Sequence, residues 1–159
     1  MNKELIGTKI LCVDDSADIL NILSVVLQSS GATVITSSSA EAAMELLEQH
    51  RFDVIISDLN MPPGMDGYDL AHALRKLEDD EPQRDVTPTV MVSGDSHVPS
   101  SKRQFADFQV YLGKPFDHTK LVHIVERLVE ADGAAVDQGS LAAWEVKAAA
   151  PKLNESLAH

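Results

Sequence analysis

The eight residues KILCVDDS at positions 9–16 place a short apolar run directly before two aspartates. Branched side chains such as Ile10 and Val13 favour a strand, and an uninterrupted apolar run is typical of a strand buried on both faces. Ser16 can cap a following helix, and the apolar residues after it recur at helical spacing until Gly31. The segment therefore predicts a buried strand that ends in carboxylates and leads into a helix.

The same alternation continues along most of the chain. Further strands are predicted at residues 33–36, 52–57, 89–93 and 110–112. Helices with one apolar face are predicted at 39–49, about 68–77 and 116–129, and a weaker helical pattern covers 98–108. We interpret 60–67 as a Pro/Gly-rich loop, and the polar, acidic stretch 78–87 as an exposed loop. Strands that alternate with helices predict an α/β, doubly wound fold with a parallel sheet covered on both faces.

The bulk composition excludes several classes of protein. The chain has 159 residues with a formal net charge of −12, and 44% of its residues are hydrophobic. This length and this hydrophobic fraction predict one globular domain with an appendage. An acidic chain is unsuited to the phosphate backbone of nucleic acids and to anionic membrane surfaces. We therefore expect no direct binding to nucleic acid or membrane.

The chain also lacks the features of an exported or membrane-spanning protein. Its first residues do not form a signal peptide, and no stretch has the about 18 consecutive apolar residues that a membrane span needs. The single cysteine, Cys12, lies within the first apolar run, so we interpret it as a small buried residue rather than a reactive thiol. We expect a cytoplasmic location.

Polar side chains follow four of the predicted strands. They are Asp14 and Asp15, Asp58, Ser93 and Lys114. Open parallel sheets bind ligands beyond the carboxyl ends of their strands, so these groups are predicted to meet at one edge. Each residue alone has a simpler interpretation, since a strand-end Asp is often a helix cap and a lone Lys is usually solvated. Their conjunction favours a site, and no nucleotide-binding glycine motif is present.

Clustered carboxylates repel each other, and a hard cation relieves that repulsion. Mg²⁺ prefers oxygen ligands and keeps several waters, so Asp15, Asp58 and a backbone carbonyl just after Asp58 suffice as direct ligands. Asp14 is expected to act through water. Asp58 can then attack a phosphoryl donor and form an acyl phosphate. Lys114 and the Ser93 hydroxyl can offset the negative charge on the phosphoryl oxygens.

These motifs together resemble the receiver domains of bacterial response regulators, and the resemblance covers about residues 9–129. It rests on LCVDDS (11–16), SDLNMP (57–62), MDG (65–67), VSG (92–94) and YLGKPF (111–116). The resemblance implies a flavodoxin-like (βα)₅ fold with a five-stranded parallel sheet in the strand order 2-1-3-4-5. The residues after 130 differ in composition, being rich in alanine and other small residues, so we predict a receiver domain at 1–130 and a tail or linker at 131–159 that can form a short helix at 140–150.

The resemblance also implies roles for individual residues. Asp58 matches the phospho-accepting aspartate, and Asp15 matches the member of the acidic pair that contacts the metal directly. Asn60 matches the residue whose backbone carbonyl binds Mg²⁺, for which Mn²⁺ could substitute. Ser93 matches the hydroxyl residue that moves toward the phosphoryl group, and Tyr111 matches the aromatic ring that reorients on activation.

The same resemblance implies a phosphorelay. Lys114 matches the family's lysine, which pairs with the phosphoryl group. The phosphodonor would be a phosphohistidine on a sensor histidine kinase or a histidine phosphotransfer protein. A downstream protein, an output domain missing from this chain, or a second copy in a homodimer would read the phosphorylated state. The chain would be a signalling phospho-acceptor that assists its own phosphotransfer and autodephosphorylation, and not an enzyme.

Three segments depart from the family pattern. MPPGMDG (61–67) has one residue more than usual between its Met-Pro and Met-Asp-Gly pieces. We expect Mg²⁺ binding to survive, because the extra residue follows Asn60, but the loop to be reshaped. The stretch 78–87 is longer and more acidic than usual. The residues Ala106-Asp107-Phe108 replace the small residues that usually precede the fifth strand.

Two other interpretations make different predictions. A phosphohydrolase of the haloacid-dehalogenase type also uses a strand-end Asp, a Ser or Thr and a Lys. It needs a second Asp two residues after the nucleophile, where this chain has Asn60, and it leaves the pair Asp14 and Asp15 without a role. A scaffold that only binds partners predicts a broken acidic site, whereas the acidic residues are all present.

Overall fold

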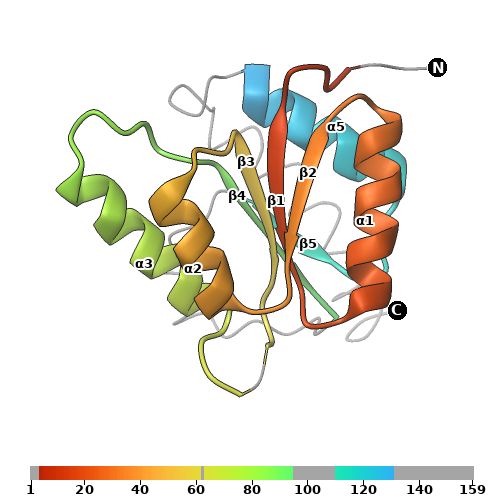
Figure 1. Cartoon of the computed structure of the whole chain (residues 1–159). Helices are drawn as coiled ribbons and strands as arrows, with labels where there is room; N and C mark the ends of the chain where they lie inside the picture. The colour runs from red at the N-terminus through yellow and green to blue at the C-terminus, as the bar shows by residue number, and fades with distance from the viewer. Residues whose placement is uncertain (1–3, 62, 95–109, 131–159) are drawn as a thin grey trace, which may run out of the picture.

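One five-stranded parallel sheet forms the centre of the protein. The structure, a computed structural model, describes residues 4–61, 63–94 and 110–130. The strands are β1 (Lys9–Val13), β2 (Thr33–Ser37), β3 (Val54–Asp58), β4 (Thr89–Ser93) and β5 (Val110–Gly113). Their order in the sheet is β2-β1-β3-β4-β5, and every neighbouring pair is parallel (Figure 1). The predicted fold class and strand order are confirmed.

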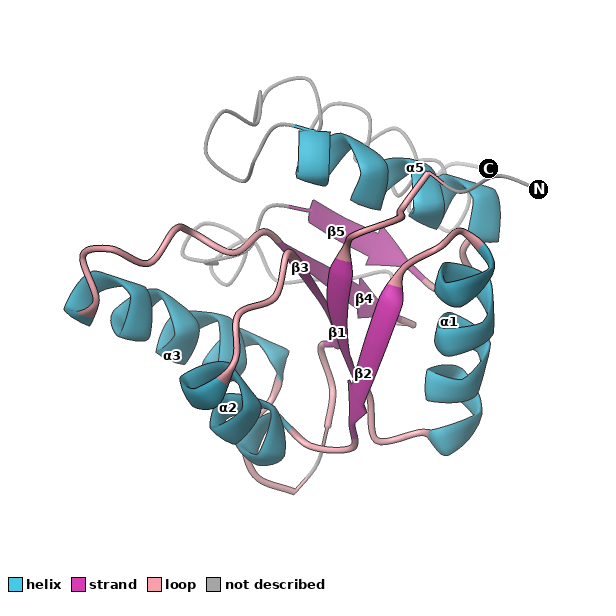
Figure 2. Ribbon diagram, turned by 45° about the horizontal axis from the view of Figure 1, so that its top comes forward, coloured by secondary structure: helices cyan, strands magenta, loops and turns pink. Residues whose placement is uncertain are grey.

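The helices cover both faces of the sheet. They are α1 (Ala17–Ser29), α2 (Ala40–Gln49), α3 (Gly67–Asp80) and α5 (His118–Glu130). Figure 2 shows α1 and α5 on one face and α2 with α3 on the other. Successive side chains of a strand point to opposite faces. Cys12 therefore joins the core beneath α1 and α5, whereas Leu11 and Val13 join the core beneath α2 and α3.

The carboxyl ends of the strands lie along one edge of the sheet. The residues at these ends are paired in register as Val13 with Ser57, Asp58 with Val92, and Ser93 with Gly113. Asp14 follows β1 directly, and Lys114 follows β5 directly. The sheet thus brings together groups that are far apart in the chain.

Side-chain caps start α1 and α2 at the predicted places. The Ser16 hydroxyl accepts a hydrogen bond from the Ile19 amide at 3.3 Å, and the Ser39 hydroxyl accepts one from the Ala42 amide at 3.1 Å. Such caps satisfy amides that have no partner within the helix. The helix after Ser16 and the helix after Ser39 are therefore confirmed together with their starting points.

The prediction of an exposed loop at 78–87 is wrong in two respects. The helix α3 continues to Asp80, so the first three residues of that stretch are helical. Three members of the stretch, Glu78, Arg84 and Thr87, are also buried. A polar and acidic composition predicts exposure only where the charged groups have no partners in the protein, because burial of an unpaired charge is costly.

Hydrogen-bond partners, from the same helix and from other segments, account for the burial of Glu78 and Arg84. The Glu78 carboxylate accepts hydrogen bonds from Arg75 Nη1 at 2.6 Å and from the Thr87 amide at 2.7 Å. Arg84 Nη2 donates to the Leu47 carbonyl at the end of α2, at 2.6 Å. Charge-assisted hydrogen bonds of this kind tie the α3–β4 connection to two helices.

Some predictions fall outside the described residues. These are the weak helix at 98–108, the tail at 131–159 and its short helix at 140–150. In the described part of the chain, no helix combines the length and hydrophobicity of a membrane span. Cys12 is fully buried in β1, as predicted, and burial raises the pKa of its thiol to about 12.

Candidate functional site

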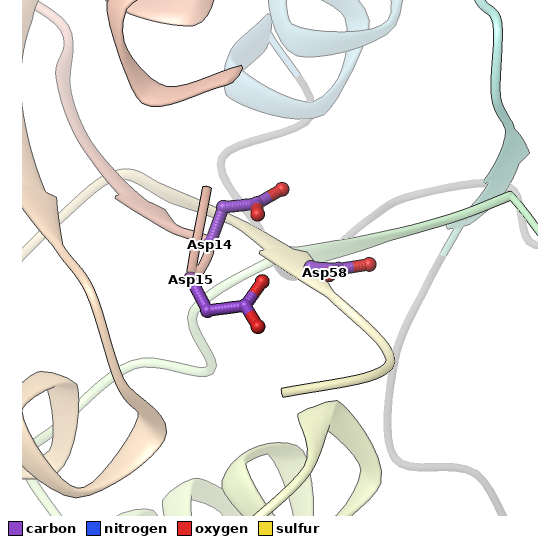
Figure 3. Close-up of side chains that lie close together, drawn as sticks. All are labelled: Asp14, Asp15 and Asp58. Carbon is purple, nitrogen blue, oxygen red and sulfur yellow. The ribbon is translucent and has the colours of Figure 1, made fainter. Parts of the chain in front are cut away.

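Three aspartates meet at the carboxyl edge of the sheet. Asp14 and Asp15 follow β1, and Asp58 ends the neighbouring strand β3 (Figure 3). One carboxylate oxygen from each lies within 4.8 Å of the other two. Asp14 and Asp58 are buried, while Asp15 is exposed at the mouth of the cluster. The sheet therefore brings together the acidic residues that the sequence predicted would converge.

Lys114 reaches the same cluster from β5. Its Nζ lies 3.2 Å from Asp14 Oδ2 and 3.5 Å from Asp58 Oδ1. The backbone amide of Lys114 donates to the Ser93 carbonyl at 2.7 Å, which joins the end of β5 to the end of β4. The peptide bond between Lys114 and Pro115 is cis. One ammonium group therefore faces two of the three carboxylates.

The orientation of Asp14 follows from its two partners. Its Oδ1 accepts a hydrogen bond from the Ser16 amide at 2.8 Å, and its Oδ2 faces Lys114. The backbone amide of Asp14 donates to the Ser37 carbonyl at 3.1 Å. Asp14 thus has both the local role of an aspartate near a helix start and a place in the cluster.

The environment of Asp58 disfavours its negative charge. Burial raises the pKa of Asp58, and the nearby charge of Asp14 raises it further. The ammonium of Lys114 and a hydrogen bond from the Asn60 backbone lower the pKa, but they only partly offset the rise. The cluster therefore holds more negative charge than its protein partners neutralise.

The donor set fits a hard divalent cation. Its groups are carboxylate oxygens, which Mg²⁺ prefers over nitrogen or sulfur ligands. Lys114 can offset only one of the three carboxylate charges in the cluster. Asp15 and Asn60 are exposed, so they border the open side of the cluster. The Asn60 carbonyl as a metal ligand stays a prediction.

Ser93 and Tyr111 lie beside the cluster on strands β4 and β5. Ser93 is buried at the end of β4, next to the strand that carries Asp58. The Tyr111 ring is also buried and packs in a small apolar group with Leu59 and Met91. Both residues are therefore near the site in the sheet, and their roles in switching stay predictions.

Gly67, the last residue of the MDG motif, lies against the backbone of Asp58. A Cβ on Gly67 would lie 2.6 Å from the Asp58 carbonyl oxygen, which is too close for any real side chain. The Gly67 amide donates to the Leu59 carbonyl at 2.9 Å. The start of α3 can therefore rest directly on the backbone at the end of β3 only because this residue is glycine.

Comparison with known proteins identifies the family. The sequence model of the response regulator receiver domain matches residues 10–126. The chain belongs to this family. Receiver domains act in two-component signal transduction, where they accept phosphoryl groups, pair with histidine kinases or phosphotransfer proteins and generally bind Mg²⁺ at an acidic pocket. The described site of this receiver domain has such an acidic cluster.

Individual relatives agree with this assignment. An uncharacterized 14.6 kDa protein of Leptolyngbya boryana is 32% identical over 121 residues, which are 74% of this chain and 87% of that protein. The heme response regulator HssR of Staphylococcus aureus is 33% identical over 70% of this chain, but this match spans only 47% of HssR. The chemotaxis response regulator CheY4 of Vibrio cholerae superposes with a TM-score of 0.65 at 32% identity, over 76% of this chain and 98% of CheY4.

Proposed function

We propose that this receiver domain accepts a phosphoryl group on Asp58 from a phosphohistidine, in a Mg²⁺-dependent reaction, and that phosphorylation switches the binding of a partner. The observation that carries the proposal is the position of the Asp58 carboxylate. It lies at the carboxyl edge of the sheet, within the three-carboxylate cluster and 3.5 Å from Lys114 Nζ. Lys114 thus stands where it can pair with a group bound to Asp58.

The chemical step is a transfer between two nucleophiles. A carboxylate oxygen of Asp58 attacks phosphorus, the phosphorus–nitrogen bond to the donor imidazole breaks, and the imidazole nitrogen keeps the electron pair. The Lys114 ammonium offsets charge on the phosphoryl oxygens, and the Ser93 hydroxyl can donate to another of them. Asp15, Asp58 and the Asn60 carbonyl would hold Mg²⁺, with Asp14 acting through water, and the bound ion would supply further positive charge. Mn²⁺ could replace it.

The switch is a change in the balance between two conformations. A phosphoryl group on Asp58 attracts the Ser93 hydroxyl and thereby favours a rearrangement of Tyr111. Support for this role comes from the place of Tyr111, which is buried beside Met91 and Leu59, the residue after Asp58. The donor would be a sensor histidine kinase or a histidine phosphotransfer protein. A downstream protein, an output domain or a second copy of the chain would read the switch.

The proposal also covers the setting of the protein. We place it in the cytoplasm, where the kinase domains of sensor proteins act, and assign it no direct binding to nucleic acid, in keeping with its net charge of −12. It acts as a phospho-acceptor that assists its own phosphorylation and dephosphorylation, without turning over a separate substrate. Asn60 supports this distinction, because a phosphohydrolase of the haloacid-dehalogenase type would have an Asp at that position.

Phosphorylation with acetyl phosphate tests the proposal. We expect the wild-type protein to gain one phosphoryl group by intact mass only when Mg²⁺ is present, and Asp58→Asn to gain none. The matched control is Asp85→Asn, which removes one negative charge from an exposed residue and should react like wild type. Phosphorylation of Asp58→Asn at the wild-type rate would contradict the assignment. Repeated turnover on phosphoester substrates would favour the phosphohydrolase.

A further inference from the structure

The first turn of α2 contacts the loop that follows the acceptor strand. Glu41 Oε2 accepts a hydrogen bond from the Met65 amide at 2.9 Å, across 24 positions of the chain. Figure 1 shows that α2 begins at the end of the sheet where the loop between β3 and α3 also lies. Glu41 is exposed, so this bond is made at the surface. The contact links an element outside the acidic cluster to the loop that leaves Asp58.

The loop backbone approaches the Glu41 carboxylate very closely at Gly64. Gly64 has a φ of +101°, a conformation that residues with a side chain rarely adopt. A Cβ at this position would lie 2.5 Å from Glu41 Oε2. The carboxylate therefore occupies the space beside Gly64 and holds the next amide, that of Met65.

The held segment continues directly into the start of α3, which contacts the end of β3. Met65 precedes Asp66, whose side chain and amide form a capping box with Asp69 at the start of α3. The next residue, Gly67, donates its amide to the Leu59 carbonyl at 2.9 Å and packs against the Asp58 carbonyl. The backbone that Glu41 holds at Met65 is thus only two residues from the backbone that supports Asp58.

The chemistry of Glu41 suits this contact. A charged carboxylate is purely an acceptor, and a hydrogen bond from an amide is stronger when the acceptor is charged. The hydrogen bond from Met65 accordingly lowers the pKa of Glu41, so the carboxylate is charged at neutral pH. A simpler interpretation is that the negative charge of Glu41 only stabilises α2, by interacting with the positive N-terminal end of the helix dipole. That interpretation predicts no effect at the acidic cluster.

We infer that Glu41 is a positioning residue, which holds the loop after Asp58 in the conformation that binds Mg²⁺. The inference rests on the proposed function, because it concerns the affinity of that metal site. Loss of the Glu41 contact frees Met65 and loosens the support that Gly67 gives to the backbone of Asp58 and Leu59. The carbonyl of Asn60, the next residue, then samples more positions, and Mg²⁺ binds more weakly.

Three variants of the full chain separate this role from a purely local one. Glu41→Ala removes the acceptor, Glu41→Gln keeps a neutral acceptor, and Glu48→Ala removes an exposed glutamate from the same helix. The two measurements are Mg²⁺ affinity by calorimetry and hydrogen exchange of the Met65 amide by NMR. The exchange measurement does not depend on Mg²⁺ or phosphorylation, so it tests the contact apart from the proposed function.

In Glu41→Ala we expect Met65 exchange to accelerate about tenfold and the Kd for Mg²⁺ to rise about three- to tenfold. Glu41→Gln should show smaller changes in the same direction, and Glu48→Ala should match wild type. Unchanged Met65 exchange in Glu41→Ala, or faster exchange with an unchanged Kd, would overturn the inference. If Glu41→Ala does not fold, Glu41→Gln decides by the same criteria. A wild-type protein that binds no Mg²⁺ overturns the proposed function and this inference before any variant is compared.

Discussion

At the scale of single residues, environment separates aspartates that look alike in the sequence. One carboxylate oxygen of Asp14 accepts a hydrogen bond from the Ser16 amide, and the other lies 3.2 Å from Lys114 Nζ. Asp58 is buried next to Asp14, and its pKa is raised despite the contact with Lys114. Asp15 is exposed. The residue that we propose as the phosphoryl acceptor therefore carries a charge that its surroundings disfavour.

This pKa shift predicts a stability change in Asp58→Asn. The folded state holds a proton on Asp58 more tightly than the unfolded chain does, so the charged carboxylate lowers stability at pH values above its raised pKa. In the presence of a metal chelator at pH 7, we expect Asp58→Asn to melt roughly 2–5 °C above wild type. The gain should shrink as the pH falls through the raised pKa of Asp58.

Thermal melts from neutral to acidic pH measure this difference. Asp85→Asn is the control, because Asp85 is exposed and its loss should change the melting temperature little at any pH. A lower melting temperature for Asp58→Asn at pH 7 would show that the Asp58 charge stabilises the metal-free fold. The described pattern of burial and charge around Asp58 would then be wrong.

At the scale of elements, the α3–β4 connection depends on a buried carboxylate. Glu78 receives Arg75 from its own helix and the Thr87 amide from the connection. Arg75 also donates to the Thr87 carbonyl and to the Thr89 hydroxyl at the start of β4. An acidic stretch that looks like a solvated loop is thus part of the packing between α3 and the sheet.

Removal of this carboxylate should be costly. In Glu78→Ala, Arg75 loses a charge partner, and the buried Thr87 amide loses its acceptor. We expect the free energy of unfolding to fall by about 2–4 kcal/mol. Chemical denaturation measures the change, with Asp79→Ala as the control because the neighbouring Asp79 is exposed. A loss in Glu78→Ala of less than about 0.5 kcal/mol, the size typical of surface substitutions, would contradict this account.

At the scale of the whole molecule, the sheet gathers one site from three strands and leaves excess negative charge there. The three aspartates of the cluster and the lysine that faces them come from positions 14–15, 58 and 114. A ligand that binds only the folded state stabilises that state. The stabilisation grows with the logarithm of one plus the ratio of the ligand concentration to its Kd. The unfolded chain has no preformed cluster, so Mg²⁺ should stabilise the protein as a whole.

We therefore expect Mg²⁺ at ten times its Kd to add about 1.4 kcal/mol to the free energy of unfolding. Thermal melts over a range of Mg²⁺ concentrations measure this shift. Asp15→Asn, which removes the exposed carboxylate of the cluster, should respond much less, while Asp85→Asn should respond like wild type. An equal response in Asp15→Asn would place the bound metal elsewhere.

The sequence alone was enough to predict the fold and to predict which residues form the acidic cluster. Apolar runs that end in Asp14, Asp58 and Ser93 specify buried parallel strands, and the polar ends of such strands must share one edge. The caps at Ser16 and Ser39 were also predictable, because a cap acts on amides only a few residues away. These features depend on short-range pattern and on the general rules of α/β sheets.

Only the tertiary structure decided which charged groups are buried and which distant residues touch. Nothing near Glu41 in the sequence points to Met65, and nothing near Arg84 points to the Leu47 carbonyl. The physical reason is that the free energy of a charged side chain depends on the partners that folding brings to it. The polar composition of 78–87 therefore led to a wrong prediction of exposure, whereas the apolar runs correctly indicated the strand ends. The sheet topology decides which of these strand ends are neighbours.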